Sequence, residues 1–292
     1  MRVEAGAFRK RLTAGGECYL HHVTAEQAAS MSAAAFVRRF KPVDALAPAE
    51  HRDAVYTDFL SGLTLTKKHA DDLRERRGLS EETIAKGLYA SVQAAAKHAV
   101  HVARIAGAYT LSGVAGFYRN ERDEWRWWSE ASSGELFIPV CDRQGRITAI
   151  LRGTDGDPKY LWFSNADRGP SCGTPLHFAR PYLAELHPND PVIITEGALK
   201  ADIIAEHLHV TVIGVAGVGS IAPLGAELDW LARRRVLVAF DADADPMLNP
   251  HVWKALVRLF EKLSAAGVTF DRLRWDMSLG KGLDDVLVRG AA

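Results

Sequence analysis

The sequence predicts an α/β protein whose last third forms a mostly parallel β-sheet flanked by helices. Two short β-branched runs, at 193–195 and 236–240, are separated by helix-like segments and end at acidic residues. Buried parallel strands have this pattern because helices cover both faces of the sheet. Open α/β sheets carry their ligand groups beyond the carboxyl ends of the strands, so Glu196, Asp241 and Asp243 should meet at one edge.

The first 115 residues predict mainly helices. Thr24 with Gln27 makes a capping-box pattern that starts a helix ending before Pro42. Further on, Thr66 is the predicted N-cap of another helix, and Gly78 is its predicted C-terminal stop.

The next part of the chain changes from helical to strand-like character. Ser80, followed by two glutamates, predicts a helix start, and 113–164 then holds glycine turns, aromatic residues and short β-like runs. Trp125 and Trp127 lie beside arginines, which suits stacking on unpaired bases, but their alternation suits core packing equally well. A segment rich in Gly, Pro and Ser, 164–181, predicts a link to the C-terminal third.

The C-terminal third alternates strands and helices. A helix is predicted at 198–207, a strand at 210–215 and a helix that ends near Arg235, before the strand at 236–240. Asn249 is the expected cap or turn residue before the last long helix.

Length, charge and cysteine content limit the classes of protein to which this chain can belong. The chain has 292 residues, enough for one or two domains, and 36 basic residues balance 36 acidic ones. Any nucleic-acid binding must therefore come from a local patch and be sensitive to salt. The three cysteines, Cys18, Cys141 and Cys172, form no C-x₂-C pair, so we expect structural thiols and no zinc ribbon.

The sequence shows no targeting or membrane segment. No run of about 18 apolar residues occurs, and the N-terminus has no signal-peptide core. We therefore expect a cytoplasmic protein that does not associate with membranes.

The order of strand, Glu196-Gly197, helix, strand, helix, strand and Asp-x-Asp resembles the Toprim domain of bacterial-type primases, topoisomerases and some nucleases. Upstream segments resemble the polymerase core of DnaG-type primases in the same order. These segments are RGLS at 77–80, FIPV at 137–140, LRG at 151–153 and PKYL at 158–161. Together they resemble a divergent primase of the kind carried by plasmids, phages and other mobile elements.

The resemblance implies three regions. Residues 1–52 would be a helical N-terminal extension of unknown role. Residues 53–180 would form a small mixed α+β, basic, template-binding subdomain. Residues 181–292 would form the Toprim catalytic domain.

The resemblance also implies a nucleotidyltransferase, a DNA-directed RNA polymerase that makes short RNA primers. Asp241 and Asp243 would hold Mg²⁺ or Mn²⁺, and Glu196 would join them or act as a general base through a water. Asp284 would complete the ring of carboxylates. Asp245 is an added acid that would either widen the metal site or start a turn.

Basic residues would face the metal. Arg152 and Lys159 fall on motif positions where a guanidinium fork and a point charge hold a template backbone or a nucleotide. The chain departs from the motifs at Lys200, where "EGYMD" ends in an acid, and at Gly282, where "DPDE" begins with one. Lys200 would contact a triphosphate, or else be an exposed residue paired with nearby acids. The loss of two carboxylates implies weaker metal binding.

The expected partners are a single-stranded DNA template, nucleoside triphosphates, and a replicative helicase or an element-encoded replication protein. Two other functions use the same residues. A Toprim nuclease would have water as its nucleophile, and a non-catalytic regulator would bind nucleic acid without turnover.

Overall fold

The computed structural model of the protein describes residues 8–11, 17–20, 45–92, 98–127, 134–154, 156–157, 159–164 and 168–290. The chain divides into two compact units, 1–44 and 45–292. The predicted boundaries at 52/53 and 180/181 stay predictions, and the first of them falls within helix α3 (Ala49–Ser61) of the second unit.

The first unit contains a β-hairpin. Strands β1 (Phe8–Arg11) and β2 (Glu17–Leu20) pair antiparallel, with Phe8 opposite Leu20. The prediction of mainly helical structure is therefore wrong for these strands. A Gly-Gly pair lies between the two strands, and such a pair is a hairpin signal. The prediction gave more weight to the helix-forming residues in the rest of this region. The helix predicted from Thr24 lies outside the described residues.

The second unit begins with short helices whose ends follow the predicted caps. The Thr66 hydroxyl accepts a hydrogen bond from the His69 amide, and Ser80 accepts one from the Thr83 amide, so both N-cap predictions are confirmed. Gly78 ends a helix with φ +67°, a conformation in which a Cβ is strained. After α3, these helices are α4 (Lys67–Asp71), the π-helical turn η1 (Asp72–Arg76), α5 (Glu81–Lys86) and α6 (His98–Ala108).

An antiparallel sheet packs against these helices. Its strand order is β3-β6-β7-β8. The strands are β3 (Ala90–Ser91), β6 (Leu136–Cys141), β7 (Ile147–Gly153) and β8 (Tyr160–Trp162), and a separate hairpin joins β4 (Phe117–Arg119) to β5 (Trp125–Trp127). Trp127 is buried edge-to-face against Phe59, with ring centroids 4.7 Å apart. Trp127 is thus a core residue and not a platform for bases.

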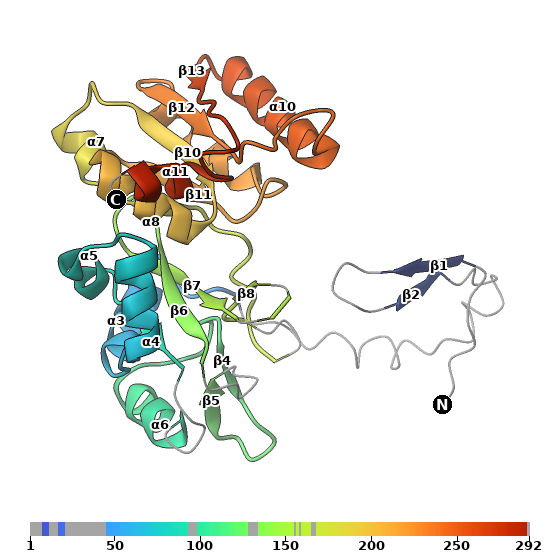
Figure 1. Cartoon of the computed structure of the whole chain (residues 1–292). Helices are drawn as coiled ribbons and strands as arrows, with labels where there is room; N and C mark the ends of the chain where they lie inside the picture. Colours follow the sequence, from blue (N-terminus) through green and yellow to red (C-terminus); the bar gives the residue numbers. More distant parts are fainter. Residues whose placement is uncertain are drawn as a thin grey trace. The chain divides into compact units, whose positions relative to one another are not determined.

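A second, mostly parallel sheet follows, with strand order β13-β12-β10-β11-β9 (Figure 1). All its neighbours pair parallel except β9 and β11. Its strands are β9 (His177–Ala179), β10 (Val192–Glu196), β11 (Val212–Val215), β12 (Arg235–Ala239) and β13 (Thr269–Arg272). The predicted mixed α/β class is confirmed.

Helices connect these strands. They are α7 (Leu183–Leu186), α8 (Ala198–Leu208), the 3₁₀ turn η3 (Ala222–Glu227), α9 (Leu228–Leu231), α10 (Pro250–Ala265) and α11 (Leu283–Gly290). The helix expected to end near Arg235 is the short α9, which ends at Leu231, and a 3₁₀ turn with Pro223 in its first turn precedes it. The Asn249 side chain accepts a hydrogen bond from the Val252 amide, so its predicted cap is confirmed.

Helix α8 joins the two sheets. Its Ala201 and Ile204 pack against the parallel sheet. Its Leu199 and Ile203 pack with Ile138 of β6, and Figure 1 shows α8 between the two sheets. Because each fully buried Leu or Ile contributes roughly 1.5–3 kcal/mol, this helix fixes the position of one sheet relative to the other.

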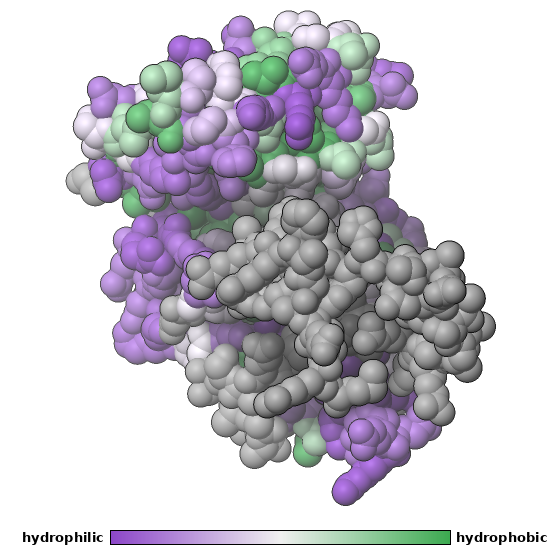
Figure 2. Space-filling model, turned by 90° about the vertical axis from the view of Figure 1, so that its right-hand side faces the viewer, coloured by the Kyte–Doolittle hydropathy of each residue, from purple (hydrophilic) through white to green (hydrophobic). Residues whose placement is uncertain are grey.

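The surface mixes polar and apolar side chains. On the face drawn in Figure 2, hydrophilic residues lie among smaller hydrophobic areas over the upper part of the molecule. Among the described helices, none has both the length and the hydropathy that crossing a bilayer requires.

Candidate functional site

The site forms where two neighbouring parallel strands end. Thr195 of β10 pairs with Ala239 of β12, and the Thr195 hydroxyl donates a 2.9 Å hydrogen bond to the Ala239 carbonyl. Neighbouring strands lie about 4.8 Å apart. Glu196 and Asp241, which follow these paired residues, therefore emerge at the same edge of the sheet, as predicted for parallel strands.

The turn after β10 requires glycine. Gly197 has φ +91°, and it leads directly into α8. A Cβ on Gly214 of β11 would lie only 2.7 Å from the Gly197 carbonyl oxygen, so the neighbouring strand also needs glycine here. These two positions let α8 begin immediately after Glu196.

A loop from the C-terminal end of the chain closes over this edge. The Ala242 amide donates a 2.8 Å hydrogen bond to the Lys281 carbonyl. This contact sets Lys281 Nζ 3.1 Å from Asp243 Oδ2 and 3.7 Å from Asp241 Oδ2. The same loop leads to Asp284 in the first turn of α11. We call Glu196, Asp241, Asp243 and Asp284 the acidic edge.

Two cations on the neighbouring helical segments also reach the acidic edge. Lys200 of α8 forms a hydrogen-bonded ion pair with Asp241 Oδ1. Arg77 Nη1 lies 3.8 Å from Asp284 Oδ2. Burial would lower the pKa of Lys200, but the Asp241 carboxylate outweighs it, so the pKa is raised and the amine is held charged.

Burial also acts on two of the carboxyl groups. It raises the pKa of Glu196, and the nearby Asp241 carboxylate raises it further. Burial likewise raises the pKa of Asp284, whose side chain is almost wholly enclosed. A cation placed beside such a carboxyl group would stabilise its charged form, which burial disfavours.

The acidic edge suits a divalent cation in the kind of atoms it offers. Asp243 Oδ1 and Asp284 Oδ1 are buried without a hydrogen-bond partner. Hard cations such as Mg²⁺ take oxygen ligands. Yet among the residues that the structure describes, no three His, Cys, Asp or Glu side chains are gathered as a metal-holding group. The predicted ring of four carboxylates therefore stays a prediction, and in this structure lysine amines contact Asp241 and Asp243.

Asp245 caps a turn that follows the Asp-x-Asp pair. Its Oδ1 accepts a 2.8 Å hydrogen bond from the Met247 amide. Of the two interpretations of this added acid, the structure supports the turn.

Arg152 does not lie on an exposed basic face. It sits on β7 with 1% of its surface exposed, and its Nη1 is 3.6 Å from Glu135 Oε2. Because both side chains are buried, this conformation offers no guanidinium to a phosphate in solvent. Binding of nucleotide or template by Arg152 stays a prediction, and its surroundings favour a structural role.

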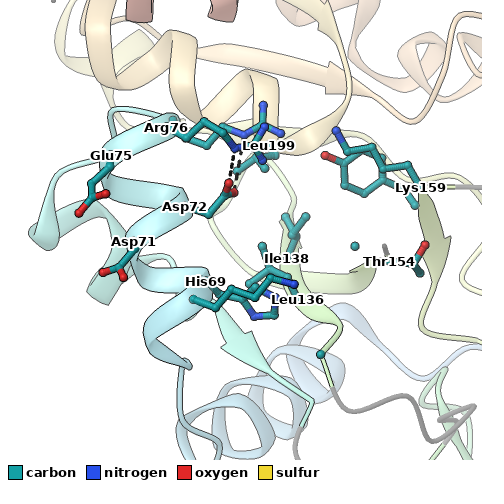
Figure 3. Close-up of a pocket in the computed structure, with 15 residues that line it drawn as sticks. His69, Asp71, Asp72, Glu75, Arg76, Leu136, Ile138, Thr154, Lys159 and Leu199 are labelled. Atoms are coloured by element: carbon teal, nitrogen blue, oxygen red, sulfur yellow. Dashed lines mark hydrogen bonds and ion pairs between the residues drawn. The ribbon is translucent and has the colours of Figure 1, made fainter. Parts of the chain in front are cut away.

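Lys159 lines a cavity of about 460 Å³ beside the acidic edge. Figure 3 shows Lys159 and Thr154 across this cavity from Asp71 and Asp72 of the α4 region. Burial lowers the pKa of Lys159, and Arg77 and Arg76, which line the same pocket, lower it further. We call this cavity the mixed-charge pocket. Its wall on the side of α8 includes Arg76, Arg77 and Leu199.

Sequence reasoning missed three cations of the site. Arg76 and Arg77 precede the glycine of the RGLS segment, and their place beside Lys159 depends on the packing of η1 against the antiparallel sheet. Lys281 precedes the last acidic motif, and its contact with Asp243 depends on the backbone hydrogen bond to Ala242. Arg77 belongs to the RGLS segment, and Arg76 and Lys281 adjoin motifs, but no spacing rule joined any of them to the acidic edge.

Of the comparisons with known proteins, the one with solved structures bears on the fold. A family model described as a domain of unknown function, DUF3854, matches residues 183–292. No curated protein matches the sequence.

Several solved structures that resemble this chain are of primases. The Aquifex aeolicus primase (zinc-binding and RNA polymerase domains) aligns at 15% identity and TM-score 0.61, covering 84% of this chain and 59% of that one. A DnaG primase catalytic domain bound to single-stranded DNA aligns at 17% and 0.54, covering 83% and 76%. The RNA polymerase domain of the Mycobacterium tuberculosis primase aligns at 12% and 0.58, covering 83% and 81%. The chain thus has the fold of a primase catalytic core, and it spans about three fifths of the Aquifex structure.

Proposed function

We propose that the protein is a primase-type nucleotidyltransferase that makes short RNA primers on single-stranded DNA. The observation that carries the proposal is the parallel pairing of β10 and β12, which brings Glu196 and Asp241 to one edge of the sheet within a fold shared with primase cores. Asp241 and Asp243 are close enough to Glu196 to raise its pKa. The reaction is in-line attack of a 3′-hydroxyl on an α-phosphorus, with pyrophosphate as the leaving group.

The acidic edge would hold Mg²⁺ or Mn²⁺ through Asp241 and Asp243, with Glu196 as a third ligand or as a base and Asp284 nearby. The ion would supply electrostatic stabilisation for the charge that develops on the reacting oxygens. Burial raises the pKa of Glu196, and a more basic carboxylate accepts a proton through a water more readily.

The mixed-charge pocket would receive the substrate or template. Lys159, Arg76 and Arg77 lie on its walls, and Lys200 is close enough to act electrostatically on Lys159. Guanidinium forks and an amine are suited to phosphate groups. These cations also explain how a chain with no net charge could bind nucleic acid through one local patch. The single-stranded DNA in a related structure supports this choice of partner.

The proposal includes service to a plasmid, phage or other mobile element, with a replicative helicase or an element-encoded replication protein as partner. The support is the departure of Lys200 and Gly282 from the primase motifs and the low identity of 11–18% to solved primases.

The test is synthesis by the purified full-length protein. Single-stranded DNA, labelled ribonucleotides and Mg²⁺ or Mn²⁺ should yield short labelled products that disappear when EDTA is added. A template that becomes shorter with no labelled product would instead show a nuclease. Binding of the DNA with neither product would support the non-catalytic regulator and would refute the polymerase.

A further inference from the structure

Lys200 occupies a central position in the acidic edge. It lies in the first turn of α8, its side chain is only 28% exposed, and its amine pairs with Asp241 Oδ1. Lys281 also contacts Asp241 and Asp243, but it is 60% exposed and lies on a loop. Lys200 is therefore the more firmly positioned cation, because a helix and its packing hold the backbone from which it extends.

The space around Lys200 depends on Gly282. A Cβ built on Gly282 would lie 3.2 Å from Lys200 Nζ and would collide with Asp284 Oδ1. The two positions at which the sequence departs from the acidic motifs are thus neighbours in space. An amine stands at one of them, and a residue with no side chain makes room for it at the other.

The residues at positions 200 and 282 make the site more positive than the acidic motifs would. A lysine in place of an acid at 200 adds two positive units, and a glycine in place of an acid at 282 adds one. Relative to those motifs the fixed charge of the site therefore rises by three units, and two carboxylate ligands are lost. The acidic edge nevertheless keeps two oxygens ready for a cation, since Asp243 Oδ1 and the 2%-exposed Asp284 have buried oxygens without a hydrogen-bond partner.

Polymerase-type sites commonly hold two divalent ions about 3.5–4 Å apart, one beside each reacting oxygen. We propose that the Lys200 ammonium takes the place of one of these two ions, so that the protein binds a single Mn²⁺ or Mg²⁺ at its acidic edge. This inference rests on the proposed function. Asp241 is then shared between the amine and the bound ion, and Lys281 moves from Asp243 when the ion enters.

The experiment counts bound Mn²⁺ on the full-length protein by electron paramagnetic resonance of the free ion during a titration. The wild type should bind one ion per chain. Lys200→Asp, which restores an acidic ligand, should bind two. Lys200→Met, which removes the charge without adding a ligand, should bind its first ion about tenfold more tightly, because a neighbouring positive charge has gone. Lys254→Asp makes the same charge change on the exposed face of α10 and should leave one ion at unchanged affinity.

Circular dichroism of each variant shows whether it is folded, and Lys200→Met still tests the inference if Lys200→Asp does not fold. Two ions in the wild type, or one in folded Lys200→Asp with unchanged affinity in Lys200→Met, would overturn the inference. If the wild type binds two ions and still makes metal-dependent primers, only the inference fails. If no variant binds Mn²⁺ and no primers form, the proposed function fails with it.

Discussion

Replacing Asp241 with asparagine is expected to lower the rate of primer synthesis by about 10³-fold, the size of effect seen when one electrostatic contribution to a reacting centre is lost. Asparagine has nearly the same shape but no charge. Its neutral amide oxygen therefore binds a divalent cation more weakly than a carboxylate does, and it cannot hold the Lys200 amine in an ion pair. The measurement is the initial rate of labelled ribonucleotide incorporation at saturating Mn²⁺.

Asp190→Asn is the matched control, because it makes the same change in an exposed turn before β10 and should leave the rate unchanged. The acidic edge would lose its assigned role if folded Asp241→Asn kept more than about a third of the wild-type rate, a difference of well under 1 kcal/mol in barrier height.

Replacing Arg152 with methionine is expected to lower the free energy of unfolding by about 3–5 kcal/mol, because it leaves a buried carboxylate without its charged neighbour. Arg152 is 1% exposed and Glu135 is 5% exposed, so water cannot compensate the loss. Guanidinium denaturation followed by circular dichroism measures the change. The double variant Arg152→Met with Glu135→Gln should recover most of the lost stability, since both charges of the buried pair are then removed.

The exposed pair Arg235 and Asp271 provides the comparison. Its side chains are 63% and 59% exposed, so Arg235→Met should cost less than about 1 kcal/mol. If Arg152→Met were as stable as the wild type yet bound single-stranded DNA much more weakly, the template-binding role predicted from its motif position would replace the structural one.

The sequence was informative wherever local chemistry decides the structure. Runs of β-branched residues predicted β10 and β12, and the parallel arrangement of these strands brings Glu196 and Asp241 to one edge. Caps at Thr66, Ser80 and Asn249 followed from side-chain oxygens next to free helix amides.

Contacts between distant segments could not be predicted in this way. The burial of Arg152 depends on a glutamate 17 positions earlier and on the packing around β7. The contact of Lys281 with Asp243 depends on a loop closed by one backbone hydrogen bond. Motif positions indicate which residue types occur at a site. They do not show which of the carboxylates form ion pairs with lysines.

The most direct test of the acidic edge is a crystal structure of the protein with Mn²⁺ and a non-hydrolysable nucleoside triphosphate, with the metal located by its anomalous scattering. The account predicts a manganese peak about 2.1 Å from carboxylate oxygens of Asp241 and Asp243, with Glu196 beside it and triphosphate oxygens completing the shell. An absent peak, or one bound elsewhere while these carboxylates stay paired with Lys200 and Lys281, would contradict it.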